Sequence, residues 1–214
     1  MIDHRYKFVH VHIPKCGGSS IESFFGYDLW DKERFPGAFY SRDLMLGKDP
    51  QTKRFLQHST LQEIITNSPE FVRDYFSFTF VRNPWSRQLS DFVYYKKRRR
   101  NKQFYNSLQF HRHFKKFLRN KQRPDPSHYI PQVDYIRDRT GKVIVDHIAR
   151  FENLQADFNI ICDKLNIPPE DLPVKNKSTY TKTDYTQYYD SESRKIIENI
   201  YAEDIDHFGY KFGA

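Results

Sequence analysis

Residues 6–21 read YKFVHVHIPKCGGSSI, and this stretch indicates the fold of the 214-residue chain. Its first part, 6–13, alternates between two sets of side chains and predicts a β-strand. Residues 14–18 predict a turn, and Ser19 or Ser20 predicts the cap of a short helix. A strand, a glycine turn and a helix in this order are typical of an α/β fold with a parallel sheet.

The turn carries residue types that suit a phosphate. Gly17 and Gly18 let backbone N–H groups approach an anion closely, and a helix start adds donors and partial positive charge. Lys15 supplies a full charge, while Ser19 and Ser20 supply hydroxyl donors. The turn differs from the G-x-x-x-x-G-K-[ST] loop of NTPases because its lysine precedes the glycines. An ordinary glycine turn with a surface lysine is the alternative interpretation.

A second strand-to-helix turn follows in residues 75–95, which read YFSFTFVRNPWSRQLSDFVYY. The aromatic run 75–81 predicts a central strand buried on both faces. Asn83 and Pro84 predict the N-cap and first position of a long helix through Tyr95.

This second turn also suits an anion. Arg82 ends the strand and can bind an oxyanion with two hydrogen bonds. Ser90 lies about two turns into the helix, on the side of the same anion. The alternative for Arg82 and Arg87 is an ordinary salt bridge near a helix start. Ligands of parallel sheets bind at the carboxyl ends of strands, so the two turns together predict a nucleotide with separate 5' and 3' phosphates.

The rest of the chain predicts further elements of an α/β domain. They are a helix at 61–66 opened by capping boxes at Ser59 and Thr60, a short helix from Ser68-Pro69, a helix around 110–118, a hairpin or strand from 133–136 and 143–148, a helix at 154–165, and a last helix from Asp190 to Ile205. No repeats interrupt this order, and we expect one domain over residues 1–214.

Composition narrows the class of protein. The net charge of +8 and the pI of about 9.3 favour an anionic partner. No apolar run has the ~18 residues of a membrane-spanning helix, and the N-terminus does not resemble a signal peptide. Cys16 and Cys162 lie far apart without metal-ligand spacing, which favours a reducing compartment. We therefore expect a cytoplasmic protein if the source is bacterial, or a Golgi-lumenal one if this is part of a eukaryotic protein.

Several motifs resemble those of sulfotransferases that use 3'-phosphoadenosine-5'-phosphosulfate (PAPS). The segment IPKCGGSSIE (13–22) resembles their 5'-phosphosulfate loop, and FTFVRNPWSRQLSDFVYY (78–95) resembles their 3'-phosphate motif. IARFENL (148–154), NKSTYTKTDYTQYY (176–189) and IYAEDIDHFGYKF (200–212) are similar to the same branch, that of heparan 2-O-sulfotransferase-like and small bacterial carbohydrate sulfotransferases. The resemblance implies a P-loop-like three-layer α/β fold, with a central parallel sheet flanked by helices, and metal-free sulfuryl transfer.

The resemblance also implies residue roles. Lys15 would contact the bridging oxygen of the leaving 5'-phosphate, where charge develops. The residues around the 5'-phosphate would be Cys16, Gly17, Gly18, Ser19 and Ser20, with Cys16 standing where the family often has threonine or serine. Arg82 and Ser90 would bind the 3'-phosphate. Asn176, Lys177 and Ser178 would close over the nucleotide.

His58 is the candidate base for the acceptor hydroxyl, since a neutral imidazole suits that role. It resembles the histidine base of the 2-O-sulfotransferase branch, but a hydrogen-bonding histidine near a helix start is an equal alternative. Glu22 is a weaker candidate, because a glutamate near a helix start also favours the helix dipole. His10 and His12 break the pattern of a buried strand, and buried hydrogen-bonded histidines are the preferred interpretation.

Other functions remain open. A P-loop-like nucleotide kinase would need its lysine after the glycines, and a basic nucleic-acid-binding module would need a recognised motif. A sulfotransferase fold without turnover is a third alternative. The basic run KKRRR (96–100) with Lys102 would suit an acidic acceptor, although a solvated helix end is preferred. Tyr180, Tyr185, Tyr188 and Tyr189 would frame a sugar or the adenine, or pack over the core. The branch favours a carbohydrate acceptor, and no nucleic acid is expected as partner.

Overall fold

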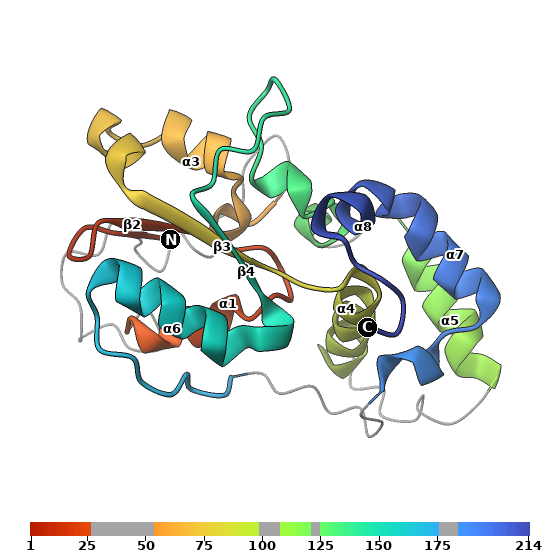
Figure 1. The fold of residues 1–214 in the computed structure, drawn as a ribbon. Helices are drawn as coiled ribbons and strands as arrows, with labels where there is room; N and C mark the ends of the chain where they lie inside the picture. Colours follow the sequence, from red (N-terminus) through yellow and green to blue (C-terminus); the bar gives the residue numbers. More distant parts are fainter. Residues whose placement is uncertain (27–53, 99–107, 121–124, 176–183) are drawn as a thin grey trace. The chain divides into compact units, whose positions relative to one another are not determined.

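The computed structural model describes residues 1–26, 54–98, 108–120, 125–175 and 184–214 (Figure 1). The chain forms two compact units. Unit 1 comprises Met1–Val81 and Gln132–Asn176, and unit 2 comprises Arg82–Pro131 and Lys177–Ala214. The expectation of a single domain over the whole chain stays a prediction.

Unit 1 is built on a four-stranded sheet with the order β1-β2-β3-β4. The strands are β1 (Ile2–Asp3), β2 (Phe8–Val11), β3 (Phe76–Val81) and β4 (His147–Arg150). β2, β3 and β4 are parallel, whereas β1 is antiparallel to β2. All of β2 and nearly all of β3 are buried, as expected for inner parallel strands covered on both faces.

Helices cover both faces of this sheet. Figure 1 shows α1 (Gly18–Phe24) and α6 (Leu154–Leu165) on one side and α3 (Leu61–Thr66) on the other. On the first side, the rings of Phe24 and Phe158 meet at 4.7 Å between centroids and join α1 to α6. The predicted α/β fold, a P-loop-like three-layer arrangement around a mostly parallel sheet, is confirmed.

At two helix starts in unit 1, the caps predicted from the local sequence can be compared with the structure. The Thr60 capping box forms, because its hydroxyl accepts from the Glu63 N–H and the Glu63 carboxylate accepts from the Thr60 N–H. The cap predicted at Ser19 or Ser20 is wrong. Gly17 is the N-cap of α1, in a left-handed conformation with φ of 91°. After Ser68-Pro69 the chain forms a 3-10 helix, η2 (Glu70–Asp74).

The predicted hairpin is wrong in part. Most of its first arm is a 3-10 helix, η5 (Val133–Tyr135). The arms pair next to the predicted turn, through a bridge from Arg137 to Val143 and a hydrogen bond from the Ile144 N–H to the Ile136 carbonyl. The strand itself is β4, which begins after Asp146. That carboxylate accepts hydrogen bonds from the N–H and the hydroxyl of Ser77, so the segment is bound to β3. The hairpin is therefore confined to the residues next to its turn, and the second arm continues into a strand that pairs with β3.

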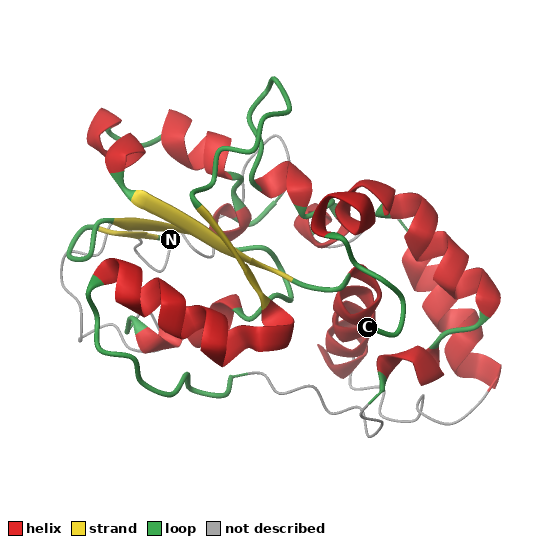
Figure 2. Cartoon of the chain, in the orientation of Figure 1, coloured by secondary structure: helices red, strands yellow, loops and turns green. Residues whose placement is uncertain are grey.

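Unit 2 is helical in its described part (Figure 2). Its elements are α4 (Pro84–Arg98), α5 (Leu108–Arg119), η4 (Pro126–Tyr129), η7 (Tyr185–Tyr188), α7 (Ser191–Ile200) and α8 (Ala202–Phe208). The Phe92 ring lies 5.0–5.3 Å from the rings of Phe110, Phe114 and Phe117, which packs α4 against α5. The predicted helices at 84–95 and 110–118 are confirmed.

Asp190 caps α7 as predicted, and its carboxylate accepts from the Ser193 N–H. The single helix predicted from Asp190 to Ile205 is wrong, because it is divided into α7 and α8 at Tyr201, where the backbone leaves helical geometry at φ of −115° and ψ of 29°. The remaining short elements of unit 1 are η1 (Leu56–His58) and η6 (Phe151–Asn153). None of the described helices is long and apolar enough to span a membrane.

Candidate functional site

The loop between β2 and α1 has an unusual backbone. Lys15 has a φ of 69° and Gly17 a φ of 91°, so two of three consecutive residues are left-handed. A non-glycine residue in this region is uncommon and stores strain that the surrounding structure must hold. No side chain caps the start of α1. The first backbone N–H groups of a helix have no intrahelical acceptor, so this loop opens onto a set of donors.

Neighbouring side chains lie so close to Gly17 and Gly18 that they leave little or no room for a Cβ atom at either position. A Cβ on Gly18 would overlap Nε2 and Cδ2 of the His12 ring and lie 2.7 Å from Cε1. A Cβ on Gly17 would come within 3.1 Å of Leu154 and 3.3 Å of Phe151. The space beside both glycines is therefore filled by neighbouring side chains, and the backbone alone forms the loop there.

The other loop residues differ in what they contact. Cys16 is buried, and its thiol lies 3.6 Å from the Pro14 carbonyl and 3.3 Å from Oε1 of Gln132, to which it donates. Ser20 is buried, and its hydroxyl accepts from the N–H of Lys175 at 3.4 Å. Lys15 and Ser19 are partly exposed. Lys15 and Ser19 are thus the loop side chains that solvent reaches, whereas the thiol of Cys16 is engaged within unit 1.

Two buried titratable residues flank the loop. Nδ1 of His12 lies 2.6 Å from Oε1 of Glu22. Glu22 is the fifth residue of α1 and so lies beyond the first turn, where the helix dipole acts. Its partner is His12. His10 stacks against His12, and burial, followed by neighbouring positive charges, holds the pKa of His10 well below its usual range. The preferred interpretation of hydrogen-bonded histidines holds for His12, whereas Nδ1 of His10 has no hydrogen-bond partner in the described part of the chain.

His58 lies beside the same loop. Its Nδ1 is 3.1 Å from the backbone carbonyl of His12, and its ring meets the His12 ring edge-on at 4.8 Å. A carbonyl oxygen only accepts hydrogen bonds, so Nδ1 of His58 carries the proton. In the neutral ring Nε2 is then the basic nitrogen, and the amide nitrogen of Gln57 lies 3.2 Å from it. This tautomer is the one that a general base acting through Nε2 requires.

The second predicted anion site lies in unit 2. Nε and Nη2 of Arg82 donate to the hydroxyl of Ser86 at 3.0 and 2.8 Å. Asn83 caps α4, since its Oδ1 accepts from the N–H groups of Trp85 and Ser86. Ser90 is buried and follows Ser86 by four residues, so both belong to one face of the helix. The Arg82 guanidinium therefore lies along the first turn of α4, where Ser86 binds it.

Sequence reasoning named Arg82 and Ser90 but did not name Ser86. The signal was present, because a serine four residues after an arginine at a helix start lies within reach of its guanidinium. His12 and Glu22 were considered and given a lesser role, and their pairing had no local signature. The structure groups Lys15, Cys16, Gly17, Gly18, Ser19, Ser20 and His58 in unit 1, and Arg82 and Ser90 in unit 2.

Comparison with known proteins identifies the family. A family model described as "Sulfotransferase family" matches residues 1–211. The chain belongs to the sulfotransferase family. An uncharacterized protein of Archaeoglobus fulgidus is 32% identical over 96 residues, which cover 45% of this chain and 72% of that protein. No solved structure matches significantly.

Family membership makes the protein a transferase of sulfuryl groups. The structure of unit 1 agrees with it in two respects. Its sheet is mostly parallel, and the loop after β2 is built on backbone donors beside a lysine. The loop differs from the G-x-x-x-x-G-K-[ST] loop of NTPases, because Lys15 precedes Gly17 and Gly18.

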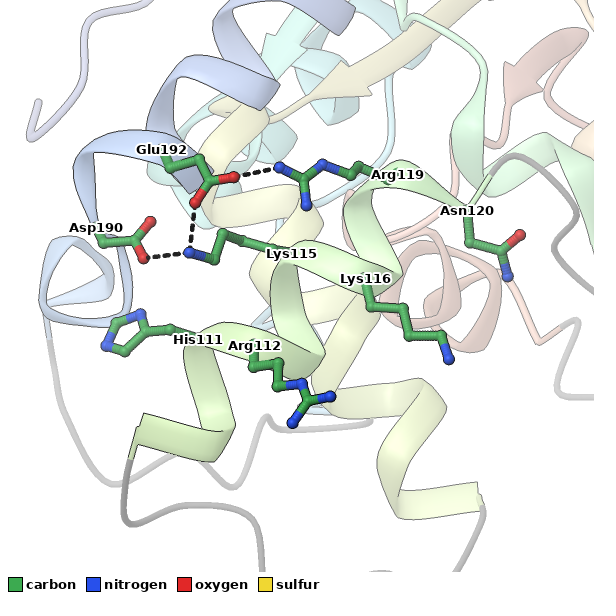
Figure 3. Close-up of a pocket in the computed structure, with 8 residues that line it drawn as sticks. All are labelled: His111, Arg112, Lys115, Lys116, Arg119, Asn120, Asp190 and Glu192. Atoms are coloured by element: carbon green, nitrogen blue, oxygen red, sulfur yellow. Dashed lines mark hydrogen bonds and ion pairs between the residues drawn. The ribbon is translucent and has the colours of Figure 1, made fainter.

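A separate basic surface of this sulfotransferase lies on α5. Figure 3 shows the pocket there, which is lined by His111, Arg112, Lys115, Lys116, Arg119, Asn120, Asp190 and Glu192. Lys115 binds Glu192 at 2.5 Å and Asp190 at 3.0 Å, and Arg119 also pairs with Glu192. Arg112 and Lys116 point away from these acids in Figure 3.

The positive charges of this surface contribute to the environment of His113. Burial and then the charges of Lys96, Arg112 and Lys116 lower the pKa of His113. Only the first residues of the predicted basic run 96–100 belong to α4, and residues 99, 100 and 102 lie outside the described ranges, as do residues 176–178 and Tyr180. The predicted roles of the run and of those residues stay predictions.

Proposed function

We propose that this sulfotransferase transfers a sulfuryl group from PAPS to a hydroxyl of a carbohydrate, by in-line transfer without a metal ion. The observation that carries the proposal is the loop between β2 and α1. Lys15 and Gly17 are left-handed, and Gly17 is the N-cap of a helix whose start has no side-chain cap. Neighbouring side chains fill the space beside Gly17 and Gly18. Such a loop suits a 5'-phosphosulfate, since its donors come from the backbone and its charge from Lys15.

The 3'-phosphate distinguishes PAPS from other adenine nucleotides, and we assign it to Arg82, Ser86 and Ser90. Ser86 accepts from Nε and Nη2 of Arg82 at 3.0 and 2.8 Å, which orients the guanidinium that we assign to the anion. Ser90 adds a hydroxyl on the same face of α4. Cys16, Gly17, Gly18, Ser19 and Ser20 would surround the 5'-phosphate, with Cys16 contributing its backbone rather than its engaged thiol.

In the transfer, an acceptor oxygen forms a bond to sulfur while the bond between sulfur and the 5'-phosphate oxygen breaks. Lys15 would stabilise the negative charge that develops on that leaving oxygen. Nε2 of His58 would take the proton of the acceptor hydroxyl, since Nδ1 is bound to the His12 carbonyl. The resulting bisphosphate leaves with the electron pair of the broken bond. These residues act by position and charge, which suits a loose anionic transition state.

The carbohydrate acceptor rests on the resemblance to the carbohydrate branch of the family. We favour the cytoplasm if the source is bacterial, or the Golgi lumen if this is part of a eukaryotic protein. Cys16 and Cys162 are buried and form no disulfide, which suits a reducing compartment. A screen of oligosaccharides, with release of the bisphosphate as readout, tests the acceptor class. Phenols, lipids and peptides in the same screen would reveal a different class.

A thermal-shift titration tests the donor. The ligands are 3'-phosphoadenosine-5'-phosphate, ADP and ATP, each in EDTA and then with magnesium. At a ligand concentration of about 100 times Kd, the folded state gains about 2.7 kcal/mol, which raises the Tm by several degrees. We expect this rise with the bisphosphate in EDTA and a much smaller one with ADP. A magnesium-dependent rise with ATP alone would contradict the proposal and favour a kinase.

The Lys15→Ala variant separates turnover from binding. We expect it to bind the bisphosphate within a few-fold of wild type and to lose about 10²–10³ in kcat, because the lysine acts on charge that develops in the transition state. The measurement is release of bisphosphate from PAPS with the best acceptor pool. Lys142→Ala, an exposed turn lysine of the same unit, is the control and should retain full activity. Equal activity of both variants would remove Lys15 from the mechanism.

A further inference from the structure

The hydrogen bond between His12 and Glu22 joins the two ends of the loop between β2 and α1. His12 directly follows β2, whereas Glu22 lies in the second turn of α1. Their 2.6 Å hydrogen bond is buried, with side-chain exposures of 8% and 6%. An unpaired buried carboxylate is costly, so Glu22 holds this bond strongly. Because an ionised carboxylate only accepts, Nδ1 of His12 is the protonated nitrogen and the orientation of the ring is defined.

One side of the oriented ring supports the loop. The His12 ring occupies the place that a side chain at position 18 would take. Gly18 is the first residue of α1, so the ring lies against the point where the backbone donors begin. Rotation of the ring would remove the support on which the position of Gly18 depends. Glu22 thereby determines the shape of the loop through His12.

His12 also contacts His58. The His12 carbonyl accepts from Nδ1 of His58 at 3.1 Å, and the two rings meet at an interplanar angle of 86°. His10 stacks on the His12 ring at 5.9 Å, so the ring is enclosed by His10, Glu22, Gly18 and His58. His12 is thus the contact between the loop and the candidate base.

We propose that His12, oriented by Glu22, is the positioning residue that couples the donor loop to the base His58. The inference rests on the proposed function, because it assigns the loop to the donor and His58 to the proton of the acceptor. Neither His12 nor Glu22 takes part in the transfer itself. Their pair holds Gly18 and the Nδ1–H tautomer of His58 in one arrangement, so that both halves of the reaction keep their geometry together.

The first test uses the wild-type protein and needs no substrate. The protein is labelled with ¹⁵N-histidine and studied at pH 8, above the usual imidazole pKa of about 6.5. Two-bond ¹⁵N–¹H correlation spectra then report which nitrogen of each ring carries the proton. We expect the Nδ1–H form for both His12 and His58, assigned with the His12→Asn and His58→Asn variants. An Nε2–H form of His58, or averaged nitrogens for His12, would overturn the inference without any effect of a mutation on folding.

The second test compares three variants of acids in unit 1. Glu22→Gln keeps an oxygen that accepts from Nδ1, and we expect bisphosphate affinity and kcat within about 3-fold of wild type. Glu22→Leu removes the acceptor, and we expect about 10-fold weaker bisphosphate binding, about 10²-fold lower kcat and averaged His58 nitrogens. Asp163→Asn, at an exposed carboxylate of α6, is the control and should match wild type.

The outcomes separate the two proposals. If wild type fails to bind the bisphosphate, the donor assignment is wrong whatever the variants do. If wild type binds it and folded Glu22→Leu binds equally, with unchanged His58 signals and unchanged kcat, the pair serves only the fold and the inference is wrong. Should Glu22→Leu not fold, His12→Asn takes its place, because its amide can donate to Glu22 but leaves Gly18 unsupported. Bisphosphate binding by His12→Asn equal to wild type would likewise contradict the inference.

Discussion

The two strand-to-helix turns of this sulfotransferase, each of which we propose binds a phosphate, would do so with different parts of the chain. The turn from β2 into α1 uses the backbone: Lys15 and Gly17 are left-handed, and Gly18 has no room for a side chain. The turn from β3 into α4 has an ordinary backbone, with Asn83 as N-cap and Pro84 at the first position of a 15-residue helix. There the groups that we propose bind an anion are side chains, above all Arg82.

This difference determines how each turn should respond to mutation. A backbone site depends on the conformation of several consecutive residues and on what packs beside them, so a single methyl group alters the whole loop. A side-chain site loses the group that is removed, while the helix beneath it persists. Substitutions of the glycines in the first turn should therefore affect stability and binding together, and those in the second turn should affect binding alone.

The largest effect is expected for Gly18→Ala. The new Cβ would overlap the His12 ring, which forces the loop or the ring to shift at a cost of about 1–3 kcal/mol. We expect a lower Tm and at least ~10²-fold weaker bisphosphate binding, measured by thermal shift and calorimetry. Gly141→Ala is the control: its φ of 87° makes alanine unfavourable by about 1 kcal/mol, but nothing lies near it, so binding should be unchanged. Bisphosphate binding by Gly18→Ala equal to wild type would contradict the view that the first turn binds through its backbone and the second through side chains.

Arg82→Ala should weaken bisphosphate binding by about 10–100-fold, as expected for loss of a charge-assisted pair. Binding of ADP, which lacks the 3'-phosphate, should stay within 2-fold of wild type. Arg82→Lys retains the charge without the fork and should recover only part of the affinity. The exposed Arg112→Ala is the matched control in the same unit. An equal loss for ADP and the bisphosphate would show that Arg82 does not recognise the 3'-phosphate.

Ser86→Ala sharpens the comparison within the second turn. The Ser86 hydroxyl accepts from Nε and Nη2 of Arg82, so its loss leaves the charge in place but removes the two hydrogen bonds that orient the guanidinium from this side. We expect 2–10-fold weaker bisphosphate binding, which corresponds to about 0.5–1.5 kcal/mol for one hydrogen bond. In the Arg82→Ala background the same change should have almost no further effect, since the two residues act as a pair. Additive losses would instead mean that Ser86 binds the nucleotide independently.

The smallest effect is a change in stability of unit 2 without any change in binding. Burial raises the pKa of Asp190, but hydrogen bonds from Ser193 and Lys115 outweigh it and lower the pKa from 3.8 to about 2. A depressed pKa stabilises the fold above pH 3.8, and that contribution is lost as pH falls towards 2. Asp190→Ala should cost about 1 kcal/mol at pH 7 through loss of the cap of α7. In urea titrations the difference from wild type should shrink between pH 4 and pH 2.5, and a difference independent of pH would contradict this assignment.

Much of the fold was predictable because its signals are local. The alternation in 6–13, the run 75–81, the Asn83-Pro84 start and the Asp190 cap each act within a few residues. Two predictions were wrong in part for different reasons. Ser77 of β3, far away in the sequence, binds Asp146, and the chain after it pairs with β3 instead of extending the hairpin. At α1 the left-handed backbone of Gly17 takes the cap position predicted for a serine.

The sequence by itself determined the two turns, the lysine and arginine that charge them, and the membership of the sulfotransferase family, since these depend on residue types at short spacing. Only the tertiary structure decided that His12 pairs with Glu22, that its ring takes the place of a side chain at Gly18, and that its carbonyl selects the tautomer of His58, 46 residues away. The physical reason is burial. A buried carboxylate or imidazole must find a partner wherever packing provides one, and no local pattern records which residue that will be.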